Sequence, residues 1–119
     1  MSGIGTRVGL AALAVSLLAG VNAASAADAA KGKILFTQKY GCYQCHGTAG
    51  QGSSITGPKL APDPIPYEAL SAFVRASARE MPPYREQVLP NEDLQDIYAY
   101  LQSIPKTVDY KTIPLLNND

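Results

Sequence analysis

Residues that bind metals through nitrogen or sulfur are scarce in this sequence. Its 119 residues include one histidine, two cysteines and two methionines, and one of the methionines is Met1. A structural zinc site takes four protein ligands, so zinc here would need a carboxylate in addition to the cysteines and the histidine. The two cysteines could instead form a disulfide. Any site built from thiol and imidazole groups must use Cys42, Cys45 and His46, which are nearly contiguous.

An excess of charge of one sign is also absent. Ten lysines and arginines balance ten aspartates and glutamates, and no basic cluster stands out. A protein that binds nucleic acid, or a membrane surface mainly through charge, would show such a cluster. We therefore expect neither kind of partner.

The sequence has no apolar run of the length that membrane-spanning helices use. The longest run, from Val8 to Val21, follows Arg7 and contains glycine and serine. It is shorter than the roughly 20 residues that a spanning helix needs. Small residues follow it up to Ala27, which completes the layout of a secretory signal. We predict a signal peptide over residues 1–27, a periplasmic or otherwise exported protein, and no integral membrane span in the mature chain. An uncleaved anchor is the alternative.

The predicted mature chain, residues 28–119, is short for a domain that must be stabilised by side chains alone. Domains of this size bury a modest share of their surface and often depend on staples or cofactors. We therefore predict a single domain with a core that includes a cofactor.

The first half of this domain begins with a helix and continues as a loop. Asp28 is suited to cap a helix that runs through Phe36 and ends near Gly41, because its carboxylate can accept hydrogen bonds from free first-turn amides. Residues 47–66 are rich in glycine and proline, which excludes a regular helix or a central strand.

Two further helices are predicted in the second half. Residues 67–77 place apolar side chains at helical spacing, and another helix runs from Asn91, as its cap, to just before Pro105. Between them, Met81 and the two prolines after it favour an extended segment. The tail from about residue 106 has no periodicity. With no strand pattern in competition, we predict an all-α fold of three main helices and Gly/Pro-rich loops.

The central motif reads CxxCH, formed by Cys42, Cys45 and His46. This pattern is typical of c-type haem attachment. On a helical turn, positions three and four apart share a face, so two thiols and one imidazole would point the same way. The thiols could then bond the two vinyl groups of a porphyrin while the imidazole binds iron. A redox dithiol, a structural disulfide and a zinc site remain the alternatives.

The second axial ligand is predicted by elimination. After His46 and the two cysteines are assigned, Met81 is the one remaining soft donor in the predicted mature chain. Methionine often only fills a core, but Met81 lies in a rigid segment before Pro82 and Pro83. If Met81 is core filler, the iron would have an open position, as in a haem enzyme or gas sensor.

The chain resembles the class I cytochrome c family over essentially its whole predicted mature length. The matching features are Gly32 and Phe36, the CxxCH motif followed by Gly47, the sequence Gly57-Pro58-Lys59-Leu60, and the sequence Ile97-Tyr98-Ala99-Tyr100-Leu101. The resemblance implies the cytochrome c fold around one haem c, with the first helix crossing the last at Tyr100. It also implies that the Pro58 carbonyl accepts a hydrogen bond from His46 and that Met81 is the distal ligand.

The resemblance further implies an electron carrier rather than an enzyme. Its partners would be redox proteins, such as a dehydrogenase, an oxidase or another cytochrome, that dock transiently. The ring of lysines found in the mitochondrial branch is absent, which argues against strongly electrostatic docking. A cytochrome subunit of a dehydrogenase or flavin hydroxylase complex is the alternative. We also expect Tyr67 or Tyr84 to hydrogen-bond a haem propionate.

Overall fold

The computed structural model describes residue 3 and residues 26–116. The predicted signal peptide, residues 1–27, therefore lies almost wholly outside the described residues. None of the described helices is both long and apolar enough to cross a membrane.

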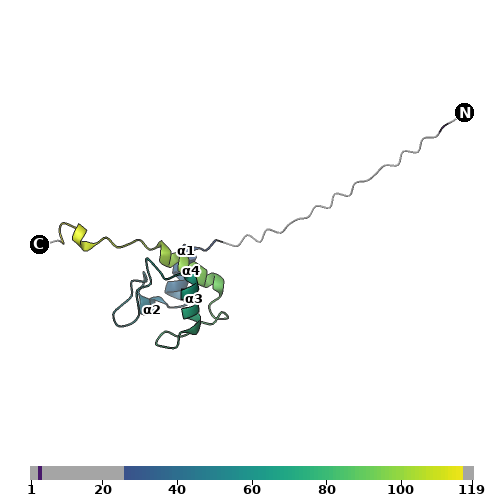
Figure 1. Cartoon of the computed structure of the whole chain (residues 1–119), viewed down its shortest axis with the longest axis horizontal. Helices are drawn as coiled ribbons and strands as arrows, with labels where there is room; N and C mark the ends of the chain where they lie inside the picture. The colour runs from purple at the N-terminus through teal and green to yellow at the C-terminus, as the bar shows by residue number, and fades with distance from the viewer. Residues whose placement is uncertain (1–2, 4–25, 117–119) are drawn as a thin grey trace.

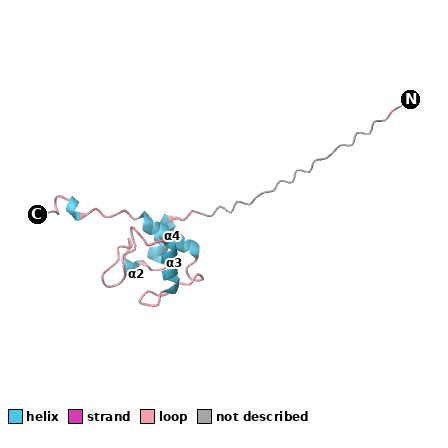
Figure 2. Ribbon diagram, viewed as in Figure 1, coloured by secondary structure: helices cyan, strands magenta, loops and turns pink. Residues whose placement is uncertain are grey.

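Helices and loops make up the described part of the chain, and no strand occurs in it (Figures 1 and 2). The all-α prediction is confirmed. In chain order the elements are α1 (Ala29–Ile34), the π-helical turn η1 (Leu35–Lys39), α2 (Tyr43–His46), α3 (Tyr67–Ala76), α4 (Asn91–Ser103) and the 3-10 turn η2 (Tyr110–Thr112).

The first helix begins and ends where its sequence predicts. The Asp28 carboxylate accepts hydrogen bonds from the amides of Ala30 and Lys31 at 2.8 and 3.1 Å, which satisfies two of the free first-turn donors. The helix α1 continues directly into η1, which ends at Lys39 with Tyr40 as its C-cap, just before Gly41.

The start of α4 differs from the prediction. Pro90 occupies the N-cap position, and Asn91, the predicted cap, is the first helical residue. The Asn91 side chain instead accepts a hydrogen bond from Arg75 and donates one to Glu86, at 2.8 and 2.7 Å. The prediction of an Asn91 cap is therefore wrong, because distant side chains use the amide that would have capped the helix.

The core is built on the contact of α1 and η1 with α4. Gly32 lies directly against the backbone of α4 at Asp96 and Ile97. One turn further on, the rings of Phe36 and Tyr100 pack with centroids 5.7 Å apart. The crossing predicted from the family resemblance is present, with Gly32 opposite Asp96 rather than Tyr100. The buried apolar cluster around it comprises Leu35, Phe36, Ala61, Leu70, Val74, Leu89, Leu94, Ile97, Tyr100 and Leu101.

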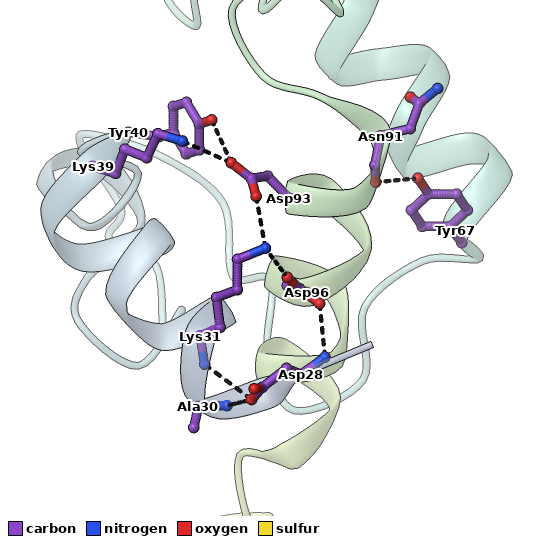
Figure 3. Close-up of polar contacts among 9 residues, drawn as sticks. All are labelled: Asp28, Ala30, Lys31, Lys39, Tyr40, Tyr67, Asn91, Asp93 and Asp96. Atoms are coloured by element: carbon purple, nitrogen blue, oxygen red, sulfur yellow. Dashed lines mark hydrogen bonds and ion pairs between the residues drawn. The ribbon is translucent and has the colours of Figure 1, made fainter. Parts of the chain in front are cut away.

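A network of charged side chains joins α1 and η1 to α4 (Figure 3). Lys31 Nζ lies 3.0 Å from an Asp93 oxygen and 2.7 Å from an Asp96 oxygen. The other Asp93 oxygen accepts hydrogen bonds from Lys39 Nζ at 2.8 Å and from the Tyr40 hydroxyl at 2.7 Å. The Lys39 contact, followed by those of Tyr40 and Lys31, lowers the pKa of the Asp93 carboxyl against the opposing effect of its burial. The second Asp96 oxygen accepts a hydrogen bond from the Asp28 amide at 2.7 Å, so every oxygen of the two buried carboxylates has a partner.

Replacing Asp93 with asparagine is expected to lower the stability of the holo-protein at pH 7 by roughly 2 kcal/mol. Because the pKa of Asp93 is lowered in the folded state, its carboxylate stabilises the fold above the unfolded-state pKa of about 3.9, and this stabilisation is lost as the pH falls toward the folded-state value. The difference in free energy of unfolding between wild type and variant should therefore be smaller in acid.

Urea unfolding at pH 7 and pH 3 measures this difference. Glu92→Gln is the control, because Glu92 is an exposed residue of the same helical turn. A difference that does not depend on pH would contradict this account.

Candidate functional site

A cavity of about 730 Å³ opens beside the helical core. Its size falls within the range of roughly 300–1,000 Å³ that is usual for cofactor sites. The side chains from α3, α4 and η1 that line it are mainly apolar, namely Phe36, Leu70, Phe73, Val74, Leu94, Ile97 and Leu101. Such a lining and volume favour a large apolar ligand over a small polar one.

The CxxCH motif forms the short helix α2 at this cavity. Cys42 is its N-cap, and the amide of His46 donates to the Cys42 carbonyl at 3.1 Å. Cys42, Cys45 and His46 all line the cavity, and both cysteines are free thiols. Burial raises the pKa of the Cys42 thiol to about 11. This favours the neutral thiol at Cys42, whereas a redox dithiol needs a reactive thiolate.

The imidazole of His46 is held in one orientation. Its Nδ1 lies 2.8 Å from the Pro58 carbonyl oxygen. A carbonyl can only accept, so Nδ1 must carry the hydrogen, and in the neutral ring this leaves Nε2 with a free electron pair. That tautomer is the one required of a metal ligand. The contact expected from the resemblance is therefore present, and it prepares Nε2 to bind iron.

The loop beneath the imidazole has contacts that the sequence did not reveal. A Cβ atom at Gly57 would lie 3.1 Å from His46 Nδ1 and 3.0 Å from the Cys45 carbonyl oxygen, so a side chain there would press on the ring. The Thr56 hydroxyl donates to the same Cys45 carbonyl at 2.7 Å. Gly57 precedes Pro58 in the sequence that resembles the family. That position is the one sequence signal that could have indicated its contact with His46.

Met81 lines the same cavity from the segment between α3 and α4. This segment is fixed to α3 at two points. The Tyr84 amide donates to the Val74 carbonyl at 2.9 Å, and Arg75 donates to the Tyr84 carbonyl at 2.8 Å. Arg75 also donates to the side chain of Asn91, at the start of α4. Sequence reasoning missed Arg75, because an arginine near a helix end usually faces water and nothing nearby in the chain indicates its partners.

The two candidate tyrosines for a propionate are already paired with protein groups. Tyr67 does not line the cavity, and its hydroxyl lies 3.4 Å from the Asn91 carbonyl oxygen (Figure 3). Tyr84 does line it, but its hydroxyl donates to the Tyr40 carbonyl at 3.1 Å. Tyr67 therefore lies outside the cavity lining, and the Tyr84 hydroxyl has its one hydrogen engaged elsewhere.

The residues at the cavity fit one covalently bound haem. Two thiols, an imidazole with Nε2 available and a thioether line a single space that is otherwise largely apolar. A zinc site would need more ligands, and in the described part of the chain no three His, Cys, Asp or Glu side chains gather as such a site requires. His46 and Met81 are the residues that would bind the iron, and Cys42 and Cys45 would form the thioether links.

Comparison with known families matches residues 27–101 to the family described as cytochrome c oxidase, cbb3-type, subunit III. The matched region starts just before α1, ends within α4 and covers more than half of the chain. No curated protein and no solved structure gave a match. The family is one of class I-like monohaem cytochrome c domains, which implies a covalent haem c, redox partners and haem-based electron transfer. With the CxxCH helix and the cavity already in place, the match shows that the chain belongs to this family of cytochrome c domains.

Proposed function

We propose that this chain is a periplasmic electron carrier whose haem c is attached through Cys42 and Cys45, with His46 and Met81 as the two axial ligands of the iron. The observation that supports it best is that all four side chains line one cavity while the Pro58 carbonyl fixes the His46 tautomer. When bound, haem c supplies reversible one-electron chemistry at its iron.

The residues around the cofactor favour electron transfer over catalysis. With His46 and Met81 both bound to iron, no open position is left for a substrate. A thioether ligand raises the reduction potential, and the apolar side chains of α3 and α4 act in the same direction because they disfavour extra charge on the iron. Export is supported by the sequence of residues 1–27, because its layout is that of a secretory signal.

The rim of the cavity supports transient docking with little help from charge. Ile55, Ile65 and Phe73 all line the cavity, yet more than half of each side chain is exposed. Lys59 and Asp63 lie among them with opposite charges. A small, largely apolar rim of this kind suits brief encounters with a dehydrogenase, an oxidase or another cytochrome.

A second candidate function is a cytochrome subunit of a larger oxidoreductase complex. The C-terminal segment beyond α4 extends away from the helices (Figure 1), lies outside the region matched to the family, and exposes Val108, Leu115 and Leu116. Exposed apolar side chains on such a segment offer a partner a place to bind. A flavoprotein or quinoprotein that co-purifies stably with the chain would favour this candidate.

Carbon monoxide binding tests the axial ligands. We expect the reduced wild-type holo-protein to resist carbon monoxide at neutral pH, because Met81 occupies the position that the gas would take. Met81→Ala should bind it rapidly and should also lose the weak far-red absorption band that reports iron–sulfur ligation in the oxidised protein.

Val88→Ala is the matched control for Met81→Ala. Val88 is an exposed apolar residue of the same segment and does not line the cavity, so this variant should behave as wild type. Rapid carbon monoxide binding by the wild-type protein would refute the ligand role of Met81 and favour an enzyme or sensor with an open iron position.

A further inference from the structure

The hydroxyl of Ser77 is buried without a hydrogen-bond partner. Ser77 has 7% of its surface exposed, and among the described residues its Oγ is the one buried side-chain nitrogen or oxygen with no partner. Ser77 also lines the cavity. Because burial of an unpaired polar group is unfavourable, such a group in a native protein calls for a specific explanation.

The Ser77 hydroxyl is the one polar group on an apolar stripe of the cavity lining. Ser77 follows the last residue of α3, at the end of a stripe of cavity-lining side chains formed by Leu70, Phe73 and Val74. The stripe is otherwise apolar, so alanine at position 77 would complete it without burying a polar group. Serine at this position therefore buries a polar group that packing alone does not require.

Three other hydroxyl groups at the cavity have partners within the protein. Thr56 donates to the Cys45 carbonyl, Tyr84 donates to the Tyr40 carbonyl, and the Ser53 hydroxyl accepts from the Ile55 amide. The Ser54 hydroxyl is exposed, so water can satisfy it. Ser77 differs from all four because its hydroxyl is buried and has no partner in the protein. Its acceptor must come from whatever fills the cavity.

A haem offers few acceptors. Its periphery is apolar apart from two propionate carboxylates, and a carboxylate is a much stronger acceptor than a thioether such as that of Met81. Arg79, two residues after Ser77, and Lys59 also line the cavity, and neither takes part in an ion pair between described residues. Cations that line the cavity attract an anionic substituent of the group that fills it.

We infer that the Ser77 hydroxyl donates a hydrogen bond to a propionate carboxylate of the bound haem. This inference rests on the proposed function, since it requires haem c in the cavity. The ionisable side chains that face the same space are His46, Lys59, Asp63, Arg79, Glu80 and Tyr84. A hydrogen bond to an ionised carboxylate favours its charged form, so Ser77 keeps the propionate ionised to lower pH.

The test is the dependence of the reduction potential on pH in the holo-protein. Ionisation of a propionate lowers the potential over a limited pH range, and loss of the Ser77 donor should move that range upward in Ser77→Ala by roughly one pH unit. The urea midpoint of the holo-protein should also fall in Ser77→Ala, because a satisfied hydrogen bond is lost. Ser54→Ala is the control, since Ser54 lines the same cavity but is exposed.

Two results would overturn the inference, and a third would overturn the proposed function on which it rests. An unchanged pH range with an unchanged or higher urea midpoint would show that the hydroxyl has no partner. A changed far-red band with an unchanged pH range would identify the Met81 sulfur as the acceptor. A wild-type product without bound haem would instead overturn the proposed function, so the two failures can be told apart.

Discussion

Replacing Cys42 or Cys45 with alanine is expected to reduce the yield of folded holo-protein on the order of tenfold or more. The reason is the cavity of about 730 Å³ that the haem would fill. Without the haem, the apolar side chains that line this open cavity would be exposed to water, and burial of apolar surface is the main favourable contribution to folding. The net stability of a small domain is only about 5–15 kcal/mol, so the domain is sensitive to this loss. Each substitution removes one of the two covalent links and so lowers the share of chains that retain the haem.

The yield is measured on the exported product by its visible absorbance and by its cooperative unfolding. Gln44→Ala is the matched control, because Gln44 lies between the two cysteines, is exposed and does not line the cavity. It should give wild-type amounts of coloured protein. Normal amounts of stable, colourless protein from either cysteine variant would show that folding does not depend on the cofactor.

Local features of the fold could be predicted because neighbouring residues determine them. The Asp28 cap depends on amides two and three positions away, and glycines and prolines exclude helix between α2 and α3 whatever surrounds them. Whether Asn91 caps α4 could not be predicted from neighbouring residues. Its side chain is used by Arg75, which is sixteen positions away, and the sequence contains no sign of that contact.

The same distinction applies to the candidate site. The CxxCH spacing alone places two thiols and an imidazole on one helical turn, since positions three and four apart share a face. Two other features depend on which faces of α3 the rest of the chain covers. They are the hydrogen bond from Arg75 to the Tyr84 carbonyl and the unpaired hydroxyl of Ser77. Asp93 likewise reads as a favourable charge in the first turn of a helix, yet the structure buries it between two lysines and a tyrosine.

Replacing Gly32 with alanine is expected to destabilise the holo-protein by about 3 kcal/mol or more. A Cβ atom at this position would overlap the carbonyl group of Asp96 on α4. The obstruction is backbone, so no side-chain rotation can relieve it and α1 must move away from α4. That movement would loosen the packing of Phe36 against Tyr100 and the ion pairs between Lys31 and α4.

Helix propensity predicts the opposite result. The sign of the change in stability therefore distinguishes the two effects. Alanine is more favourable than glycine inside a helix by about 1 kcal/mol, so in an isolated helix the substitution would be stabilising. Urea unfolding of the holo-protein measures the outcome, with Lys33→Ala as control, because Lys33 is the exposed neighbour of Gly32 in α1. A Gly32→Ala variant as stable as wild type would mean that the two helices can separate at little cost. The close crossing would then not be what holds α4, and the cavity wall that it forms, in place.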